Sequence, residues 1–411
     1  MIPYKNHTNC RVCRSDKLTE YLNLGMMPLS NGLTNTRAEA IDIDRLPLKV
    51  LFCENCGLSQ LSIVVAPEVM FNNYLYRSSI NRPYVAHCRE MAKYLKAKYK
   101  LNQSSFMIDI AGNDCALLKE FREEIGLNVL NIDPAKNLAQ ICVDKNIKTL
   151  SQFWGMKAAR DLPEKVDLIT ATNVFAHVDN VREFILACKR SLDEKGILVI
   201  EFPYLIDFIE QREFDTIYFE HLSYFSIYPL DLLCEEYSLE ILHVEKIPIH
   251  GGSVRVEIGH AGEGKKRDNT VSQAIRNERE KYSHIGWYNI FSKDVGYSIM
   301  RFRSEIKGLE NVAGFAASAK GNTLLNCAGI TRELKYIIDE TPEKMNKYSP
   351  GTGIKIVSLD KLKHDPPDYL VILSWNFADA IIEKCVNYGY KGKFIIPIPE
   401  FKILERKEVV V

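Results

Sequence analysis

The spacing of apolar and polar residues changes along the chain, and between 104 and 201 it follows one regular rhythm. Short apolar runs alternate there with amphipathic stretches that begin near 115, 134 and 180. The apolar runs cover 106–110, 127–132, 166–171 and 196–201. Strands that alternate with helices in this way are typical of a parallel sheet with helices on both faces. We therefore predict an α/β, doubly wound domain over 71–262.

The rest of the pattern predicts three further parts. A turn-rich stretch with one alternating strand at 46–52 indicates a small module over 1–70. Residues 268–310 contain no proline and carry apolar residues at helical spacing, which predicts a helical connector over 263–310. A second strand, loop and helix begins at Val312 and predicts a C-terminal Rossmann-like domain over 311–411. A chain of 411 residues, 46% of them hydrophobic, is long enough for several cores.

Charge and hydropathy narrow the classes of function. The chain has 53 basic and 53 acidic side chains, so no net field attracts nucleic acid or an anionic membrane. No stretch approaches the roughly 20 apolar residues that a membrane-spanning helix needs, and the first residues lack the apolar segment of a signal peptide. We expect a cytoplasmic protein without nucleic-acid or membrane partners.

Four cysteines form two Cys-x-x-Cys pairs, Cys10 with Cys13 and Cys53 with Cys56. This spacing lets two thiolates of one tight turn bind the same tetrahedral ion, so the two pairs predict a structural Zn²⁺ site that folds the first module. The alternatives are redox pairs, buried cysteines or a zinc ribbon that binds nucleic acid, and no basic, aromatic cluster supports the last. We expect reduced, mostly buried thiols at the cysteines that occur singly, namely Cys88, Cys115, Cys142, Cys188, Cys234, Cys327 and Cys385.

Polar residues follow the predicted strands of the central domain, where a doubly wound sheet binds its ligands. The first strand leads into a turn with a single glycine, and an aspartate before a proline ends the second. These positions fit a cofactor that carries a nucleoside, with Asp133 placed to bind ribose hydroxyls. The candidate cofactor-binding residues are Asp109, Ala111, Gly112, Asn113, Asp133, Pro134 and Asn173. His177 follows the third strand and is either a catalytic group or a helix cap.

A phenol, a carboxylate and an imidazole lie within four positions at Tyr218, Glu220 and His221. Such a group can remove and return protons near neutral pH. The alternative is an aromatic-rich segment that packs on the core and leaves the glutamate and histidine at its solvated edge.

The order of these motifs resembles that of the sugar C-methyltransferases, nearly from end to end. The resemblance rests on the two cysteine pairs, on Asp339 with Lys344, and on the segments 25–31, 71–78, 131–137, 218–225, 250–255, 316–323, 348–351, 365–369 and 374–377. It implies a zinc-binding module, a class I methyltransferase-like domain and a C-terminal Rossmann-like domain. It also implies transfer of a methyl group from S-adenosylmethionine to the carbon, commonly C3, beside the ketone of a nucleotide-linked 4-keto-6-deoxy sugar.

The resemblance assigns roles to individual residues. His221 would be the base that forms an enolate, Tyr218 and Glu220 would set its position and protonation, and His177 and Tyr76 would lie near the sugar ketone and the reacting face. A site of this kind needs a base and a donor for the enolate oxygen. The candidate substrate-binding residues are Tyr224, His250, Arg255, Ser318, Lys320, Gly321 and Asp339. For Lys320 the alternative is a solvated lysine at a helix start.

The sequence departs from the family pattern in its turns. The first loop usually reads acidic-x-Gly-x-Asn-Asp-Gly, and here Ala111 and Cys115 replace the two glycines. A Cβ at either position adds bulk, so cofactor binding is expected to be weakened, reshaped or lost. Phe219 stands where a second histidine is common, and the leading Gly-Ala of the C-terminal loop is Ala316-Ala317.

Two other functions compete with C-methyl transfer at this point. A keto-sugar epimerase or isomerase would use the same enolisation without a methyl donor. A non-catalytic nucleotide-sugar-binding protein would need no proton-transfer group. We expect a dTDP, CDP or GDP sugar as the ligand, in a monomer or weak homodimer.

Overall fold

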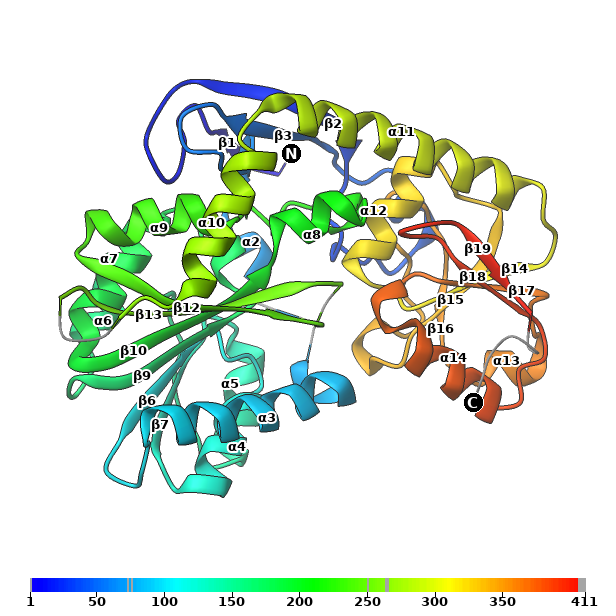
Figure 1. The fold of residues 1–411 in the computed structure, drawn as a ribbon. Coiled ribbons are helices and arrows are strands. Elements are labelled where there is room, and N and C mark those ends of the chain that lie inside the picture. The colour runs from blue at the N-terminus through cyan, green and yellow to red at the C-terminus, as the bar shows by residue number, and fades with distance from the viewer. Residues whose placement is uncertain (1, 72–73, 75–76, 250, 263–265, 406–411) are drawn as a thin grey trace.

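The computed structural model describes residues 2–71, 74, 77–249, 251–262 and 266–405, and a small N-terminal module, a central sheet and a C-terminal sheet form its main parts (Figure 1). A long helix, α11 (Ile285–Lys307), runs along the N-terminal module and reaches the C-terminal part (Figure 1). Among the described residues, no helix is both long and apolar enough to cross a membrane.

The N-terminal module is built from short antiparallel strands. Its main sheet has the order β11-β4-β3-β2, and β1 pairs with β5 beside it. The elements are β1 (Tyr4–Asn6), β2 (Leu18–Met27), α1 (Arg37–Ile41), β3 (Leu46–Cys53), β4 (Ser59–Leu61), β5 (Ile63–Val65) and α2 (Pro67–Phe71). The edge strand β11 (Ser223–Tyr224) comes from the central part of the chain. The module is therefore completed by residues about 160 positions further along the sequence.

The central sheet has seven strands in the order β12-β13-β10-β9-β6-β7-β8. The strands are β6 (Phe106–Ile110), β7 (Asn128–Ile132), β8 (Lys148–Leu150), β9 (Val166–Thr172), β10 (Leu192–Pro203), β12 (Leu239–Ile247) and β13 (Ser253–His260). Five are parallel, whereas β12 and β13 form an antiparallel edge. Four of the parallel strands were predicted from the sequence, whereas β8 and the antiparallel pair were not.

Helices cover both faces of this sheet, as the doubly wound pattern predicts. Met107, Leu168 and Val199 pack in one core cluster with α3 and α4, whereas the residue after each of them packs in the other cluster with α7. This alternation follows from the two-residue period of a strand. The helices are α3 (Arg82–Tyr99), α4 (Ala116–Ile125), α5 (Lys136–Asp144), α6 (Met156–Arg160), α7 (Val181–Ser191), α8 (Leu205–Glu210) and α9 (Ile227–Glu236).

The C-terminal part is a second doubly wound sheet with the order β16-β15-β14-β17-β18-β19. All pairs are parallel except that of β19 with β18. The elements are β14 (Val312–Phe315), α12 (Ala319–Ala328), β15 (Leu334–Ile338), β16 (Ile356–Val357), α13 (Lys361–His364), β17 (Tyr369–Ile372), α14 (Ala378–Asn387), β18 (Lys393–Ile396) and β19 (Lys402–Leu404).

Two helices, α10 (Asn269–Lys281) and α11, link the two sheets; α10 packs against β12 and α9, and α11 packs against β2 of the N-terminal module. The fully buried Tyr288 of α11 lies against Phe52 of β3 and Tyr21 of β2, with ring centroids 4.5 and 5.0 Å apart. Aromatic contacts of this kind bury large areas and fix the relative position of the elements. The connector thus holds the small module against the rest of the chain.

Candidate active site

A cavity of about 1490 Å³ is lined by residues from the N-terminal module, the central sheet and the C-terminal sheet. Its walls include Asn31, the carboxyl ends of β6, β7 and β9, and the loop at the start of α12. Both doubly wound sheets therefore present their strand ends to one space. A ligand pocket for one small molecule usually measures about 300–1,000 Å³, so this cavity has room for a cofactor and a second ligand together.

The turn after β6 keeps a tight conformation without its usual glycines. Ala111 (φ 55°), Asn113 (φ 55°) and Cys115 (φ 63°) all have left-handed backbones. Gly112 between them is irreplaceable, because a Cβ there would lie 2.6 Å from Asn131 Oδ1 and 2.7 Å from Asp109 Oδ2. The Ala111 N–H donates to Ile132 O at 2.7 Å. A left-handed non-glycine residue costs roughly 1–2 kcal/mol, and the packed surroundings of this turn enforce that conformation.

Two buried carboxylates shape the same turn. Asp133, at the end of β7, accepts hydrogen bonds from Asn113 N–H (2.9 Å) and Ala135 N–H (2.8 Å). Asp109 accepts one from Thr170 Oγ1 at 2.7 Å. Burial raises the pKa of Asp109 to about 7, although the Thr170 hydroxyl acts in the opposite direction. Both carboxylates line the cavity, where hydroxyl and amine groups of a nucleoside-bearing cofactor would find acceptors.

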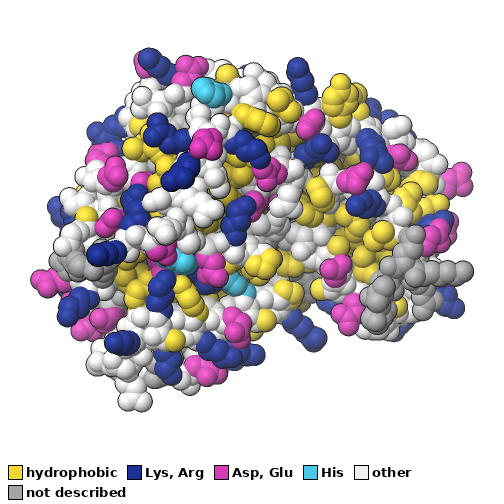
Figure 2. All heavy atoms as spheres, viewed as in Figure 1, with side chains coloured by type: hydrophobic (Ala, Val, Ile, Leu, Met, Phe, Trp, Pro, Cys, Tyr) yellow, Lys and Arg dark blue, Asp and Glu magenta, His cyan; other side chains and the backbone are white. Residues whose placement is uncertain are grey.

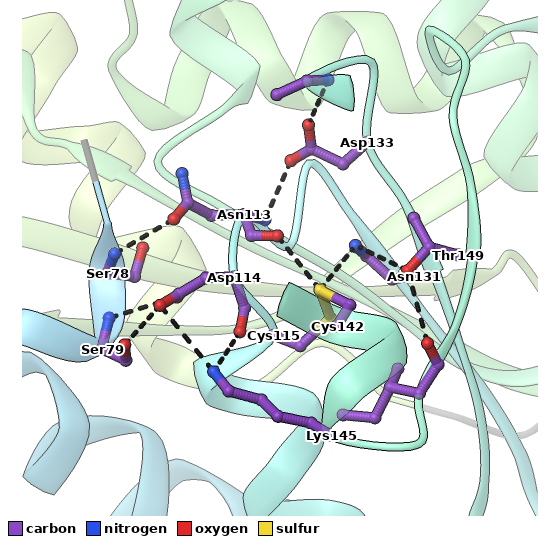
Figure 3. The surroundings of a disulfide bond; sticks show 12 residues. Ser78, Ser79, Asn113, Asp114, Cys115, Asn131, Asp133, Cys142, Lys145 and Thr149 are labelled. Carbon is purple, nitrogen blue, oxygen red and sulfur yellow. Dashed lines mark hydrogen bonds and ion pairs between the residues drawn. A yellow bond between two sulfur atoms is a disulfide. The ribbon is translucent and has the colours of Figure 1, made fainter. Parts of the chain in front are cut away.

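Cys115 and Cys142 form a disulfide, which corrects the expectation that both are reduced thiols. The bond joins the residue before α4 to the last turn of α5, and Figure 3 shows it directly beneath the turn that Asn113 and Asp133 hold together. The prediction was wrong because the two cysteines are 27 positions apart in the sequence, and only the fold brings their Cα atoms within 5.6 Å.

Tyr218 and His221 form a hydrogen-bonded pair at the centre of the cavity wall. The His221 ring lies between two partners, with Nδ1 2.8 Å from Thr216 O and Nε2 2.8 Å from the Tyr218 hydroxyl. The carbonyl of Thr216 can only accept, so Nδ1 carries the proton and Nε2 is the unprotonated, basic nitrogen. Burial raises the pKa of Tyr218 far above its usual value, so this phenol stays protonated and donates to Nε2.

Glu220 and His177 complete the cluster. Burial raises the pKa of Glu220 to about 7, while hydrogen bonds from Asn31 Nδ2 (2.7 Å) and the Tyr74 hydroxyl (3.5 Å) lower it. His177 stacks on His221 with ring centroids 5.0 Å apart, and Phe71 covers its other face. Desolvation lowers the pKa of His177 to about 4, so this imidazole is neutral at physiological pH. The cluster therefore combines one basic nitrogen with a carboxylate that titrates near neutrality.

The C-terminal sheet contributes Ser318, Lys320 and Asp339 to the opposite wall. Ser318 caps α12 by accepting from Gly321 N–H, and Lys320 Nζ lies 3.3 Å from Glu213 Oε2 and 5.0 Å from the Trp375 ring centroid. Burial opposes the ionisation of Asp339, but Lys344 and nearby backbone N–H groups outweigh it and hold the pKa of Asp339 below its usual value. Lys320 is thus a half-buried cation rather than a solvated surface lysine.

Not every predicted substrate residue lies on the cavity wall. Tyr224 is buried in β11, and Gly321 lies inside α12 behind Ser318. Arg255 on β13 faces Glu201 and Glu245, with N–O distances of 2.7 and 3.1 Å. Tyr76 and His250 lie outside the described residues.

Several cavity residues were not among the predicted site residues. Asn31, Tyr74 and Lys344 belong to motifs that the family resemblance marked, but nothing in the sequence assigns them a role. Phe153 and Trp154 follow β8, a strand that the sequence analysis omitted, and they add aromatic surface beside Asp133 on the same wall. Recognising β8 would have directed attention to the residues after it.

The four predicted zinc ligands come together at the head of the N-terminal module. The sulfur atoms of Cys10, Cys13, Cys53 and Cys56 all lie within 4.8 Å of one another. Four thiolates at this spacing fit a tetrahedral Zn²⁺ ion with metal–sulfur bonds of about 2.3 Å. Such an ion would fix the turn before β2 and the end of β3, and with them the sheet that β11 completes.

Three family models match successive segments: a putative zinc binding domain over 10–71, a methyltransferase domain over 80–244 and a C-methyltransferase C-terminal domain over 248–399. The C-methyltransferase NovU of Streptomyces niveus is 28% identical over 98% of both chains.

Solved structures resemble the chain over a part of its length. The magnesium protoporphyrin IX methyltransferase of Synechocystis with bound S-adenosylmethionine covers 43% of this chain and 80% of its own, with 11% identity and a TM-score of 0.34. An S-adenosylmethionine-dependent methyltransferase of Clostridium acetobutylicum covers 42% and 91%, with 10% identity and a TM-score of 0.34.

The fold and the family models decide between the general classes of function. The central sheet ends in a turn that lines the cavity, a four-cysteine cluster precedes it, and each segment matches the corresponding domain model in the same order. Together these features identify the chain as a member of the zinc-binding, S-adenosylmethionine-dependent C-methyltransferases.

Proposed function

We propose that the enzyme transfers the methyl group to the carbon beside the ketone of a nucleotide-diphosphate 4-keto-6-deoxy sugar, in deoxysugar biosynthesis. One observation carries the proposal: the proton-transfer cluster of Tyr218, Glu220 and His221 lies in the same cavity as both strand-end sites. Bound S-adenosylmethionine would supply an electrophilic methyl group from the side of Asp133. A nucleotide diphosphate would be held on the side of Lys320.

The cluster supports removal of a proton from carbon. A sugar C–H is acidic enough only when an adjacent carbonyl takes up the charge as an enolate. His221 Nε2 is the unprotonated nitrogen and accepts that proton, and the resulting imidazolium is favoured by the carboxylate of Glu220 nearby. The protonated Tyr218 hydroxyl, released from Nε2, is available to donate to the enolate oxygen.

The C-terminal wall supports the nucleotide part of the proposal. The N-terminus of α12 offers backbone N–H groups, and Lys320 adds a cation beside them. A diphosphate at this point places its sugar toward the cluster that follows Asp215, because α12 packs directly on the segment 214–216. The specific nucleotide and the methylated position are part of the proposal, with C3 favoured by the family resemblance.

A product assay tests the proposal. The enzyme is incubated with methyl-labelled S-adenosylmethionine and dTDP-, CDP- or GDP-linked 4-keto-6-deoxy sugar, and the product is analysed by mass spectrometry and NMR. We expect a new carbon–carbon bond beside the ketone. In D₂O with S-adenosylhomocysteine, we expect deuterium at the same carbon, and His221→Asn should lower both rates by about 10²–10⁴-fold. Methylation of an oxygen or nitrogen, or turnover that survives in His221→Asn, would contradict it.

A further inference from the structure

Asn31 contacts the proton-transfer cluster from the N-terminal module, to which the proposed reaction assigns no other role. It lies in the turn after β2 of the N-terminal module, 189 positions before Glu220, and its Nδ2 is 2.7 Å from Glu220 Oε1. Both residues line the cavity. The described part of the chain shows no lysine or arginine paired with this carboxylate, so the amide is its closest donor.

The turn that carries Asn31 is fixed from both ends. Within the turn, Gly32 N–H donates to Leu29 O at 3.0 Å. On its far side, Thr34 and Tyr348 of the C-terminal part exchange two backbone hydrogen bonds of 3.0 and 3.2 Å. The amide is therefore presented by rigid backbone rather than by a free loop, as a group that orients a catalytic partner needs to be.

The geometry of the pair depends on the charge of Glu220. An ionised carboxylate only accepts hydrogen bonds, and an amide nitrogen only donates, so the Asn31 Nδ2 contact stabilises the carboxylate form. The other titratable groups nearby are the Tyr74 hydroxyl at 3.5 Å, Tyr218, and His221, the next residue in the chain, whose ring stacks on that of His177. None of these carries a positive charge in the resting state derived above. The Asn31 amide thus offsets the free-energy cost of burying the ionised Glu220 carboxylate.

From these contacts we infer that Asn31 is a positioning residue which keeps Glu220 ionised for catalysis, and that the zinc-binding module thereby contributes directly to the chemistry. The inference rests on the proposed enolisation, in which the Glu220 carboxylate favours the imidazolium of His221. With the pKa of Glu220 near 7, a single donor decides how much of the enzyme is in the active form at physiological pH.

The test is the pH dependence of kcat/KM for Asn31→Ala between about pH 5.5 and 9.5. Loss of the donor raises the pKa of Glu220, so the acid limb of the profile should move to higher pH by about one unit. Activity at pH 7 should then fall about fivefold and return toward the wild-type value near pH 9. Asn35→Ala, an exposed asparagine of the same loop, is the matched control and should leave the profile unchanged.

A double variant separates positioning from a structural role. In Glu220→Gln, which cannot titrate, adding Asn31→Ala should cause no further shift. A uniform loss of activity at every pH, or a shift that persists in the Glu220→Gln background, would overturn the inference. Zinc content and thermal unfolding of each variant show whether the module is intact.

A spectroscopic titration distinguishes failure of this inference from failure of the proposed function. Infrared difference spectra against Glu220→Gln report the protonated carboxyl of residue 220 without any substrate. Its midpoint should lie near pH 7 in the wild-type enzyme and higher in Asn31→Ala. An unchanged midpoint would refute the role of Asn31 even if the sugar assay succeeds, whereas a shifted midpoint without sugar methylation would refute only the substrate.

Discussion

The same arrangement of single residues recurs in the two strand-end turns of the molecule. Ala111 and Ala316 are both left-handed, and each donates its N–H at 2.7 Å to the last residue of the neighbouring strand. Asp133 and Asp339 then accept from the N–H groups of the turn at 2.8–2.9 Å. The difference is the cation: Lys344 lies 3.2 Å from Asp339. The central turn is thus left acidic and the C-terminal turn is neutralised, which suits a cationic cofactor on one side and an anionic ligand on the other.

The buried Asp109 leads to a prediction about stability and pH. Its pKa is about 7 in the folded protein and 3.8 in an exposed chain, so the folded state binds the proton more tightly. The stability that this group contributes is complete below about pH 4 and is lost as the pH rises to 7. Asp109→Asn should therefore gain about 3 kcal/mol in unfolding free energy, relative to wild type, between pH 4.5 and 8. Urea unfolding without cofactor at several pH values measures this difference.

The control for that series is Glu90→Gln, which removes an exposed carboxylate on α3. It should follow the wild-type curve across the same pH range. If the unfolding free energy of Asp109→Asn also changes with pH in parallel with that of wild type, the carboxyl of Asp109 is not desolvated as described. Cofactor affinity of the variant is expected to fall, since Asp109 lines the cavity beside Gly112.

The disulfide links the start of α4 to the end of α5 beside the turn that lines the cavity. It closes a loop of 27 residues, and a crosslink of that length contributes about 3–4 kcal/mol in the chain-entropy account. We predict that peptide mapping without reductant recovers Cys115 joined to Cys142. Reductant should lower the unfolding midpoint of the wild-type protein but leave Cys142→Ser unchanged. Cys327→Ser, a half-buried thiol on α12, should respond like wild type. Free thiols at both positions after oxidative purification would contradict the pairing.

The zinc-binding module would also contribute to the proposed active site. Its sheet takes β11 from the segment that follows His221, and its turn presents Asn31 to Glu220. We predict that Cys53→Ser loses zinc by elemental analysis and lowers methyl transfer by up to about 100-fold, because small displacements of catalytic groups are costly. S-adenosylmethionine affinity by calorimetry should change little, since its turn lies on another sheet. Full activity without bound zinc would refute this.

Local features of the chain were predictable from the sequence, whereas long-range pairings were not. The strand ends at Asp109 and Asp133 and the two cysteine pairs follow from spacing within a few residues. The contact between Asn31 and Glu220 depends on how three parts pack. Arg255 illustrates the same limit: it lies opposite Glu201 through the pairing of β13 with β10, a register that no motif encodes. The antiparallel strands β12 and β13 themselves were also not predicted from the sequence.

The arrangement of the whole molecule joins the C-terminal sheet to the catalytic segment through buried charges. Lys320 of α12 faces Glu213, and Trp375 Nε1 donates to Asp215 Oδ2 at 2.8 Å. Burial raises the pKa of Glu213 and Asp215, and Lys320 acts in the opposite direction. Glu213 and Asp215 lie a few positions before Tyr218 in the chain. A ligand that binds Lys320 would therefore also affect the backbone that leads to Tyr218.

Lys320 therefore supports a prediction about how the two ligands bind. Lys320→Ala removes the cation that the proposed diphosphate needs, and a charge-assisted contact of roughly 1.5–3 kcal/mol corresponds to about a 10- to 100-fold loss of affinity. Calorimetry with dTDP should show this loss, while binding of S-adenosylhomocysteine on the other side of the cavity stays within a few-fold. Lys335→Ala removes the same charge from the exposed edge of β15 and is the matched control. An equal loss of dTDP affinity in both variants would show that the effect comes from net charge alone. Unchanged dTDP affinity in Lys320→Ala would show that the nucleotide does not bind at α12.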